Sequence, residues 1–314
     1  MASSKDKKIP ESRGGHSWKN KLSEYVIALR PWSFSASLTP VSLGSALAYK
    51  LTGEFSVLIF IVSCVTTLSV HAAGNLVNTY CDYKRGVDSK KSDDRTLIDH
   101  ILNPNDVATL GGIFYFVGLV GCFITVCLSS SSVEHLALVF FGGLSSSFLY
   151  TGGPALKYHA LGDIVIFLTF GPITVLFAFL TQTGRLGVLP MVYAIPLAMN
   201  TEAILHSNNT RDMNSDQTAN IVTLPILLGR TGSYVIFVAL LFVPYVIFAV
   251  LSANFTAWFL LPVLTIPMAF DCERKFRAGF LKEMPQQIAK INLIFGLLYV
   301  LAILIAPASR IPGF

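Results

Sequence analysis

Nine apolar segments, most of them close to 20 residues long, constrain the fold of this chain more than any other feature. A helix needs about 20 residues to cross the hydrocarbon core of a bilayer. Because lipid offers no hydrogen-bond partners to the backbone, such segments must be helical. With only 13% charged residues and a mean hydropathy of +0.61, the chain is predicted to be an all-α membrane protein. We place its nine transmembrane helices at about residues 33–50, 56–81, 108–128, 134–151, 162–181, 188–209, 232–251, 255–272 and 288–306.

The distribution of basic residues predicts how these helices are oriented. If the N-terminus is cytoplasmic, 20 Lys and Arg residues fall on the cytoplasmic side and only Lys50, Arg185 and Arg310 on the other. The positive-inside rule describes this asymmetry. It accounts for the net charge of +5 without nucleic acid, for which no motif is present. Residues 1–30 are predicted to be a disordered basic tail, and residues 31–314 the nine-span domain.

Two of the predicted helices end in matching polar faces. Asn75, Asn78 and Asp82 stand at i, i+3 and i+7, and the same spacing recurs as Asn209, Asp212 and Asp216. On a helix this spacing puts the three side chains on one face. The predicted topology places both faces on the cytoplasmic side of the membrane. A repeat of this kind is hard to explain as solvation, because a carboxylate inside a membrane costs about 2.5–3.5 kcal/mol.

Oxygen ligands that are few in number and lie beside basic residues suit Mg²⁺, which completes its shell with phosphate and water. We therefore predict a Mg²⁺-diphosphate site in which Asp82, Asp212 and Asp216 are catalytic metal ligands. Asp88 is a further candidate ligand, and the neutral oxygens of Asn75, Asn78 and Asn209 either bind the metal directly or support its ligands.

Several other residues are candidates for binding substrate. Arg95 follows two aspartates in a loop that is either a solvated charge run or a lid over a diphosphate. Tyr150 and Lys157 flank a Gly-Gly-Pro turn on the cytoplasmic side, where Lys157 either contacts phosphate or helps to orient the helix. Glu202 and His206 form an i, i+4 pair inside the sixth segment. They are either a hydrogen-bonded core pair, or a polar pocket for an acceptor or a proton relay, since ionisable groups inside membranes are usually functional.

The sequence resembles the UbiA superfamily of intramembrane aromatic prenyltransferases, and within it the menaquinone branch, across all nine segments. The motifs that carry this resemblance are R-P-W-S-F at 30–34, N-L-V-N-x3-D-x3-G-x-D from 75, S-D-D-R-T-L, Y-T-G-G-P-A-L-K, L-G-D-I and N-N-x-R-D-x3-D. By resemblance, Asn78, Asp82, Asp212 and Asp216 match the Mg²⁺ ligands of the family. The residues matching positions near the diphosphate are Arg30, Arg95, Tyr150, Lys157 and Arg211. The chain departs from the family pattern at Thr79, where many members have Asp, and at Asn220, where Gly is common.

The resemblance implies a UbiA-type bundle that transfers a geranylgeranyl group from its diphosphate to the reduced naphthoquinone menadiol, giving menaquinone-4 (vitamin K2). It also implies endoplasmic reticulum or Golgi membranes, with mitochondria as an alternative, and association with HMG-CoA reductase. Prenylation of another aromatic acceptor, such as a ubiquinone precursor, is the nearest alternative. A non-enzymatic carrier or sterol-pathway binding protein is the other. The clustering of the acidic residues at one membrane face, rather than at the midplane, argues against a carrier.

Overall fold

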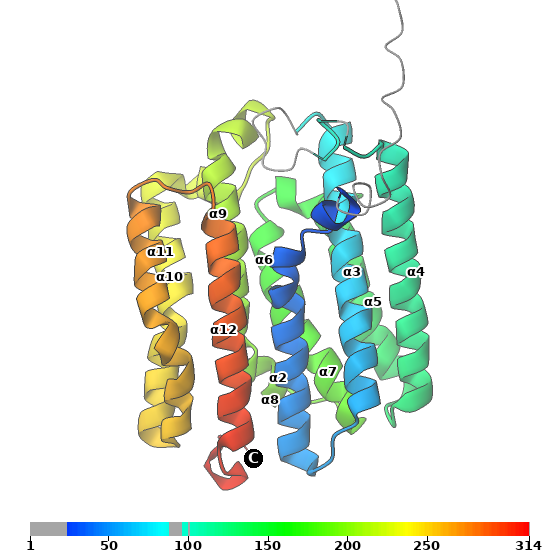
Figure 1. The fold of residues 1–314 in the computed structure, drawn as a ribbon, viewed down its shortest axis with the longest axis vertical. Coiled ribbons are helices and arrows are strands. Elements are labelled where there is room, and N and C mark those ends of the chain that lie inside the picture. The colour runs from blue at the N-terminus through cyan, green and yellow to red at the C-terminus, as the bar shows by residue number, and fades with distance from the viewer. Residues whose placement is uncertain (1–23, 88–95, 100, 314) are drawn as a thin grey trace, which may run out of the picture.

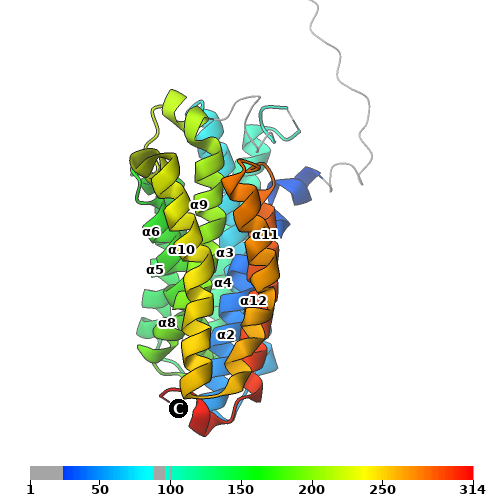
Figure 2. The same cartoon turned by 90° about the vertical axis from the view of Figure 1, so that its left-hand side faces the viewer.

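The chain folds into a bundle of roughly parallel helices (Figures 1 and 2). The computed structural model describes residues 24–87, 96–99 and 101–313. Within these ranges the secondary structure is helical, apart from one isolated β-bridge between His159 and Val222. The first half contains η1 (Pro31–Phe34), α2 (Ser35–Thr52), α3 (Val57–Lys84), α4 (Pro104–Leu128), α5 (Val133–Thr151), η2 (Leu156–Tyr158), α6 (Gly162–Leu168), η3 (Thr169–Ile173) and α7 (Thr174–Thr183). The second half contains α8 (Leu189–Tyr193), α9 (Ile195–Thr218), α10 (Leu224–Asn254), η4 (Ala257–Thr265), α11 (Ile266–Arg277), α12 (Met284–Ile305) and η5 (Ala308–Arg310).

Six helices in the described ranges are long and apolar enough to cross a membrane. They are α3, α4, α5, the continuous stretch Gly162–Thr183, α10 and α12. The other three predicted segments overlap α2, α8 with α9, and η4 with α11. Serine and threonine residues in α2, and the polar second half of α9, lower the mean hydropathy of these elements. The all-helical membrane character is thus confirmed, whereas the nine-span count and the cytoplasmic N-terminus remain predictions.

Several elements differ from simple membrane helices. Residues 24–28, which the sequence assigned to the tail, are helical, because Ala28 packs with Leu76 and Leu97 in a small apolar cluster. The fifth segment contains a π-helical turn, η3, around Pro172. Gly229 adopts φ 69° and breaks the start of α10. The eighth segment begins as a 3-10 helix that contains Pro262, where a proline interrupts regular α-helical hydrogen bonding.

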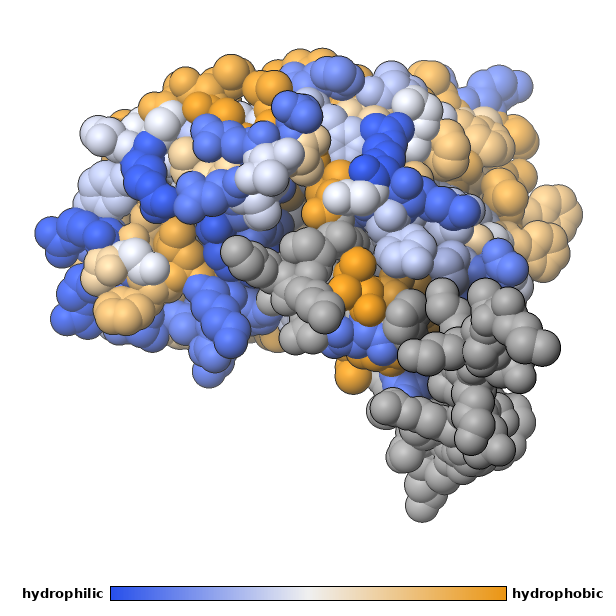
Figure 3. Space-filling view, turned by 90° about the horizontal axis from the view of Figure 1, so that it is seen from above, coloured by the Kyte–Doolittle hydropathy of each residue, from blue (hydrophilic) through white to orange (hydrophobic). Residues whose placement is uncertain are grey.

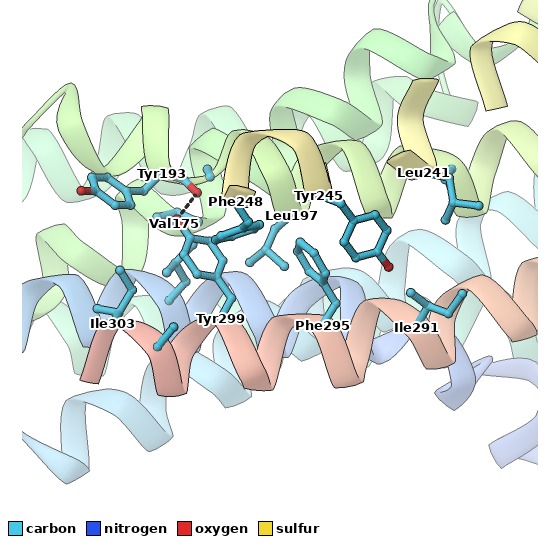
Figure 4. Packing of buried hydrophobic residues seen from close by; sticks show 14 of the residues in the cluster. Val175, Tyr193, Leu197, Leu241, Tyr245, Phe248, Ile291, Phe295, Tyr299 and Ile303 are labelled. Atoms are coloured by element: carbon cyan, nitrogen blue, oxygen red, sulfur yellow. Dashed lines mark hydrogen bonds between the residues drawn. The ribbon is translucent and has the colours of Figure 1, made fainter. Parts of the chain in front are cut away.

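The largest apolar core lies between α10, α12 and α9, with α2 and α7 behind them. Figure 4 shows Phe248 packed between Phe295 and Tyr299, with ring centroids 5.4 and 4.7 Å away. The Tyr299 hydroxyl donates to the carbonyl oxygen of Tyr193 over 3.1 Å, so a polar atom in this core is satisfied. Lipid supplies no hydrophobic driving force between helices, so close van der Waals packing of this kind holds them together.

The helices that carry the two polar faces end at the same end of the bundle. In Figure 1 the C-terminal ends of α3 and α9 both lie at the top, whereas the end of the chain lies at the bottom. Hydrophilic residues gather over this upper face (Figure 3). The prediction that the two polar faces share one side of the protein is therefore met in the fold.

Candidate active site

One cavity of about 280 Å³ receives side chains from α2, α3, α5, α6, η3, α7 and α9. Towards the ends of α3 and α9 its wall is polar, and deeper in the bundle it is apolar. The predicted residues that line the polar part are Arg30, Asn75, Asn78, Asp82, Tyr150, Lys157, Asn209, Arg211, Asp212 and Asp216. Val70, Val139, Phe140, Leu144, Ile173 and Phe177 line the apolar part. Both i, i+3, i+7 faces therefore point into one space.

The polar face of α3 is held by residues from the end of α5 and from η2. Lys157 Nζ lies 2.6 Å from Asn78 Oδ1 and 2.6 Å from Asp82 Oδ2. Thr151 donates to the same Asn78 oxygen over 3.0 Å. The Tyr158 hydroxyl donates a hydrogen bond to Asp82 Oδ1. Burial and the neighbouring Asp82 raise the pKa of Tyr158, so its hydroxyl keeps the proton that it donates.

The loop that carries Lys157 is shaped by close packing. Ala155 has a left-handed backbone, with φ 52°, just before η2. A Cβ atom at Gly162 would lie 3.1 Å from the ring of Tyr150 and 3.2 Å from the Cα of Lys157. Gly162 therefore lets both predicted substrate-binding residues approach α6 closely, and this contact fixes Lys157 beneath the acidic end of α3.

On the polar face of α9, Arg211 forms hydrogen bonds with two neighbouring side chains. Arg211 Nε and Nη2 donate to the two oxygens of Asp212 over 2.9 and 2.7 Å, and Nη2 also donates to Asn208 Oδ1 over 2.8 Å. One turn further along, burial and the charge of Asp212 raise the pKa of Asp216 to about 7. Two carboxyl groups, those of Asp212 and Asp216, therefore lie close together at this end of α9.

These residues fit a Mg²⁺ ion shared with a phosphorylated substrate. An ammonium group bridges oxygens of Asn78 and Asp82, and the carboxylates of Asp212 and Asp216 line the same end of the cavity. Within the described ranges, there is no group of three or more His, Cys, Asp or Glu side chains that could hold a metal ion without other ligands. That is typical of Mg²⁺, which takes one or two protein carboxylates together with substrate phosphates and water.

The remaining candidates differ in their placement. Arg30 lines the cavity next to η1, where its own backbone is left-handed with φ 53°. Asn75 also lines it, but its amide nitrogen donates to Leu29 O over 3.0 Å and thus supports the segment before η1. Asp88 and Arg95 lie outside the described residues.

Glu202 and His206 lie one layer behind the cavity wall. Both are buried, and neither lines the cavity. His206 Nε2 lies 2.9 Å from the carbonyl oxygen of Ser233 on α10, and its Nδ1 lies 3.6 Å from Asp163 Oδ1 on α6. The buried carboxyl group of Glu202 lies near Asp163, but neither of its oxygens has a hydrogen-bond partner among the described residues. The pair thus joins α9 to α6 and α10, and Asp163 is its unforeseen third member.

Sequence reasoning missed two groups that touch the site. Tyr158 directly follows Lys157, and that adjacency was the one signal that could have indicated its contact with Asp82. Ser33 and Ser37 line the cavity beside His71. No sequence spacing links them to His71, because they come from different helical segments.

This structure defines a class of protein. A bundle of membrane-length helices, with carboxylates, carboxamides and basic groups at one end of a long, mainly apolar cavity, is suited to an intramembrane enzyme acting on a lipid diphosphate. The sequence comparison makes this specific: the chain belongs to the UbiA prenyltransferase family, whose sequence profile matches residues 37–306. It is accordingly an aromatic prenyltransferase, as the resemblance implied.

Individual relatives agree with this assignment. The chain is 60% identical to UbiA prenyltransferase domain-containing protein 1 of Danio rerio over 294 aligned residues. The aligned region covers 94% of this chain and 88% of that protein. Its fold is similar to that of a UbiA homologue from Aeropyrum pernix, with a TM-score of 0.68 at 15% identity over 87% of this chain and 98% of that one. A UbiA homologue from Archaeoglobus fulgidus, solved with GPP and Mg²⁺, matches with a TM-score of 0.60 at 14% identity, covering 90% of this chain and 99% of that one.

Proposed function

We propose that this chain transfers a geranylgeranyl group from geranylgeranyl diphosphate to menadiol, the reduced form of a 1,4-naphthoquinone, in a Mg²⁺-dependent reaction. The direct product is menaquinol-4, the reduced form of menaquinone-4, together with diphosphate. The observation that carries the proposal is the convergence of α3 and α9. These two helices bring Asn78, Asp82, Asp212 and Asp216 to the polar end of one cavity, next to Lys157. The apolar remainder of the cavity suits an isoprenoid chain.

The polar residues have different roles in binding the diphosphate. Asn78, Asp82, Asp212 and Asp216 would hold Mg²⁺, which neutralises the charge that grows on the departing diphosphate. Lys157 provides a positive charge at the same end of the cavity. Its ammonium group exchanges Asn78 and Asp82 for phosphate oxygens when substrate binds. Arg211 orients Asp212 and remains within reach of the substrate.

The rest of the reaction needs a dry site and an electron-rich acceptor. The bond between C1 and the diphosphate oxygen breaks, and its electron pair leaves with the diphosphate. An aromatic ring carbon then forms a bond to C1, and a base takes the proton from that ring carbon. An allylic cation would react with water, so the apolar wall protects it. Because a quinone ring is electron-poor, the acceptor must be reduced to its quinol first.

The choice of acceptor and donor rests on the menaquinone-branch motifs, and an activity assay tests it. Purified protein in nanodiscs is supplied with geranylgeranyl diphosphate, Mg²⁺ and menadione, with and without dithionite. We expect menaquinol-4, detected as menaquinone-4 after air oxidation of the extract, only when Mg²⁺ and dithionite are both present. Equal product without reductant would contradict the cation mechanism. Preference for 4-hydroxybenzoate over menadiol would favour the ubiquinone-precursor alternative. If no diphosphate is released with any acceptor, the alternative of a non-enzymatic carrier would be favoured.

The metal ligands are tested by Asp82→Ala and Asp212→Ala. Each variant is expected to lose at least about 100-fold in prenyl transfer across a full Mg²⁺ titration, because second-sphere changes alone cost 10–100-fold. Asp271→Ala is the matched control, since Asp271 is exposed on α11 and pairs with Lys275 over 2.6 Å. Its activity should match the unmodified protein. Normal activity of the Asp82 or Asp212 variant at saturating Mg²⁺ would refute the ligand assignment.

We further propose, from the family motifs, that the protein resides in endoplasmic reticulum or Golgi membranes and associates with HMG-CoA reductase there. Fractionation of cell membranes, followed by co-purification in mild detergent, tests both points. Recovery in mitochondrial fractions would support the alternative location, and absence of the reductase from the purified complex would exclude a stable association.

A further inference from the structure

His71 lies on α3 and lines the cavity between two serine hydroxyls. Its Nδ1 is 2.8 Å from Ser37 Oγ, and its Nε2 is 3.2 Å from Ser33 Oγ. The single proton of the Ser33 hydroxyl goes to the carbonyl oxygen of Arg30, over 2.8 Å. Ser33 can therefore only accept from His71, so Nε2 carries the ring proton and Nδ1 accepts from Ser37. A neutral imidazole with an accepting Nδ1 satisfies all of these bonds.

His71 is the last residue along α3, counted from the polar end of the cavity, that brings an ionisable or carboxamide side chain to the cavity wall. Asn78 and Asp82 lie C-terminal to it on the same helix face, and on its N-terminal side the cavity continues with Val70, Thr67 and Thr66. With a rise of 1.5 Å per residue, His71 is roughly 10 Å along the helix axis from Asn78. The reacting carbon of a prenyl diphosphate is bonded to the diphosphate, so the chemistry occurs near this stretch of α3. A ring that attacks that carbon lies within about 3–3.5 Å of it.

Aromatic side chains flank His71 on two sides. The ring of Phe170 meets it edge-on with centroids 4.6 Å apart, and the ring of Phe34 does so at 5.4 Å. Phe170 also lines the cavity, and it belongs to the π-helical turn η3. Such turns often occur at functional sites. The surroundings of His71 therefore offer both an apolar ring surface and one hydrogen-bond acceptor.

We propose that His71, held by Ser33, positions the aromatic acceptor: its Nδ1 accepts a hydrogen bond from a ring hydroxyl that takes the place of the Ser37 hydroxyl. This inference rests on the proposed function. It gives the site a way to discriminate between oxidation states, because a quinol hydroxyl can donate to Nδ1 whereas a quinone carbonyl cannot. It also assigns the acceptor contact to a histidine on the cavity wall rather than to Glu202 and His206 behind it.

The test separates acceptor binding from diphosphate binding. Steady-state kinetics of His71→Leu should show a KM for the quinol that is raised about 10-fold, with the KM for geranylgeranyl diphosphate within about twofold of the unmodified protein. His71→Gln, which retains an acceptor oxygen, should recover part of the loss. Ser37→Ala should lower the KM for the quinol a few-fold, because the acceptor no longer displaces a hydroxyl. A purely structural role predicts that His71→Leu and Ser37→Ala both weaken activity and thermal stability together.

Three outcomes would overturn the proposal. The first is an unchanged KM for the quinol in a folded His71→Leu protein. The second is a raised quinol KM in His206→Leu but not in His71→Leu. The third is a Ser37→Ala protein that binds the quinol more weakly. Failure of the proposed function itself is distinguishable, because then the unmodified protein would release no diphosphate in the presence of Mg²⁺ and any quinol, whatever the state of residue 71.

Discussion

Lys157 Nζ lies 2.6 Å from Asp82 Oδ2, joining the loop after α5 to the end of α3. The two residues are 75 positions apart in the sequence. The lysine also reaches Asn78 Oδ1, so it occupies the oxygens that a metal ion would use. Under the proposed function, Mg²⁺ and the diphosphate must displace this ammonium group from Asp82 and Asn78 when they bind.

Removing this lysine should weaken binding of the prenyl diphosphate. A hydrogen bond to a charged group contributes about 1.5–3 kcal/mol, which corresponds to about 10–100-fold in KM. We expect Lys157→Met to raise the KM for geranylgeranyl diphosphate by that factor in initial-rate measurements. Lys84→Met is the control, because Lys84 is exposed at the end of α3 and lies over the ring of Tyr80 instead. Unchanged KM values in both variants would exclude a phosphate contact for Lys157.

The hydroxyl of Tyr158 should support metal binding through Asp82. Partners that orient a metal ligand typically contribute 10–100-fold to affinity or activity. Tyr158→Phe should therefore raise the Mg²⁺ concentration for half-maximal activity by about 10-fold or more. Tyr234→Phe removes the same kind of bond, from a tyrosine to Glu273 over 2.7 Å, in a part of the bundle away from the cavity. If the two variants shift the Mg²⁺ dependence equally, Tyr158 has no specific role at the metal site.

Close packing of α2 against α7 depends on Gly44. A Cβ at this position would lie 2.3 Å from the carbonyl oxygen of Val175 and 2.9 Å from Ala178 Cβ. Gly44→Ala should therefore destabilise the protein by about 1–3 kcal/mol. Gly142 on α5 has nothing within 4 Å of its Cβ position, so Gly142→Ala should be neutral or stabilising by up to about 1 kcal/mol. Thermal unfolding in detergent, followed by tryptophan fluorescence, compares the two. Equal midpoints would show that α2 and α7 can separate without cost.

The two ends of the chain should lie on opposite sides of the membrane. The basic residues predict a cytoplasmic N-terminus, and the structure places the C-terminal end opposite the polar end of the cavity. With a different tag at each end, protease treatment of sealed microsomes should remove the N-terminal tag and spare the C-terminal one. If the protease removes both tags, the two termini lie on the same side of the membrane, and the prediction of nine spans is wrong.

The sequence by itself determined the features that depend on local periodicity. Apolar segments of bilayer length must be helices, because the backbone has no other way to satisfy its hydrogen bonds in lipid. The i, i+3, i+7 spacing placed Asn75, Asn78 and Asp82 on one face, and both repeats of this spacing do line the cavity. The family motifs identified the class of enzyme before any coordinate was known.

Only the tertiary structure decided which side chains meet across helices. The contact of Tyr158 with Asp82, the pairing of His71 with Ser33 and Ser37, and the placement of Glu202 behind the wall are examples. None of these contacts follows from sequence spacing. Each depends on the axial position and the rotation of one helix relative to its neighbour. Those relations are fixed by packing, such as the contact of Gly44 with Val175, and by irregular turns such as η3. One residue corresponds to about 100° around the helix axis. A rotation of α3 by that angle would turn His71 away from the cavity and leave the sequence pattern unchanged.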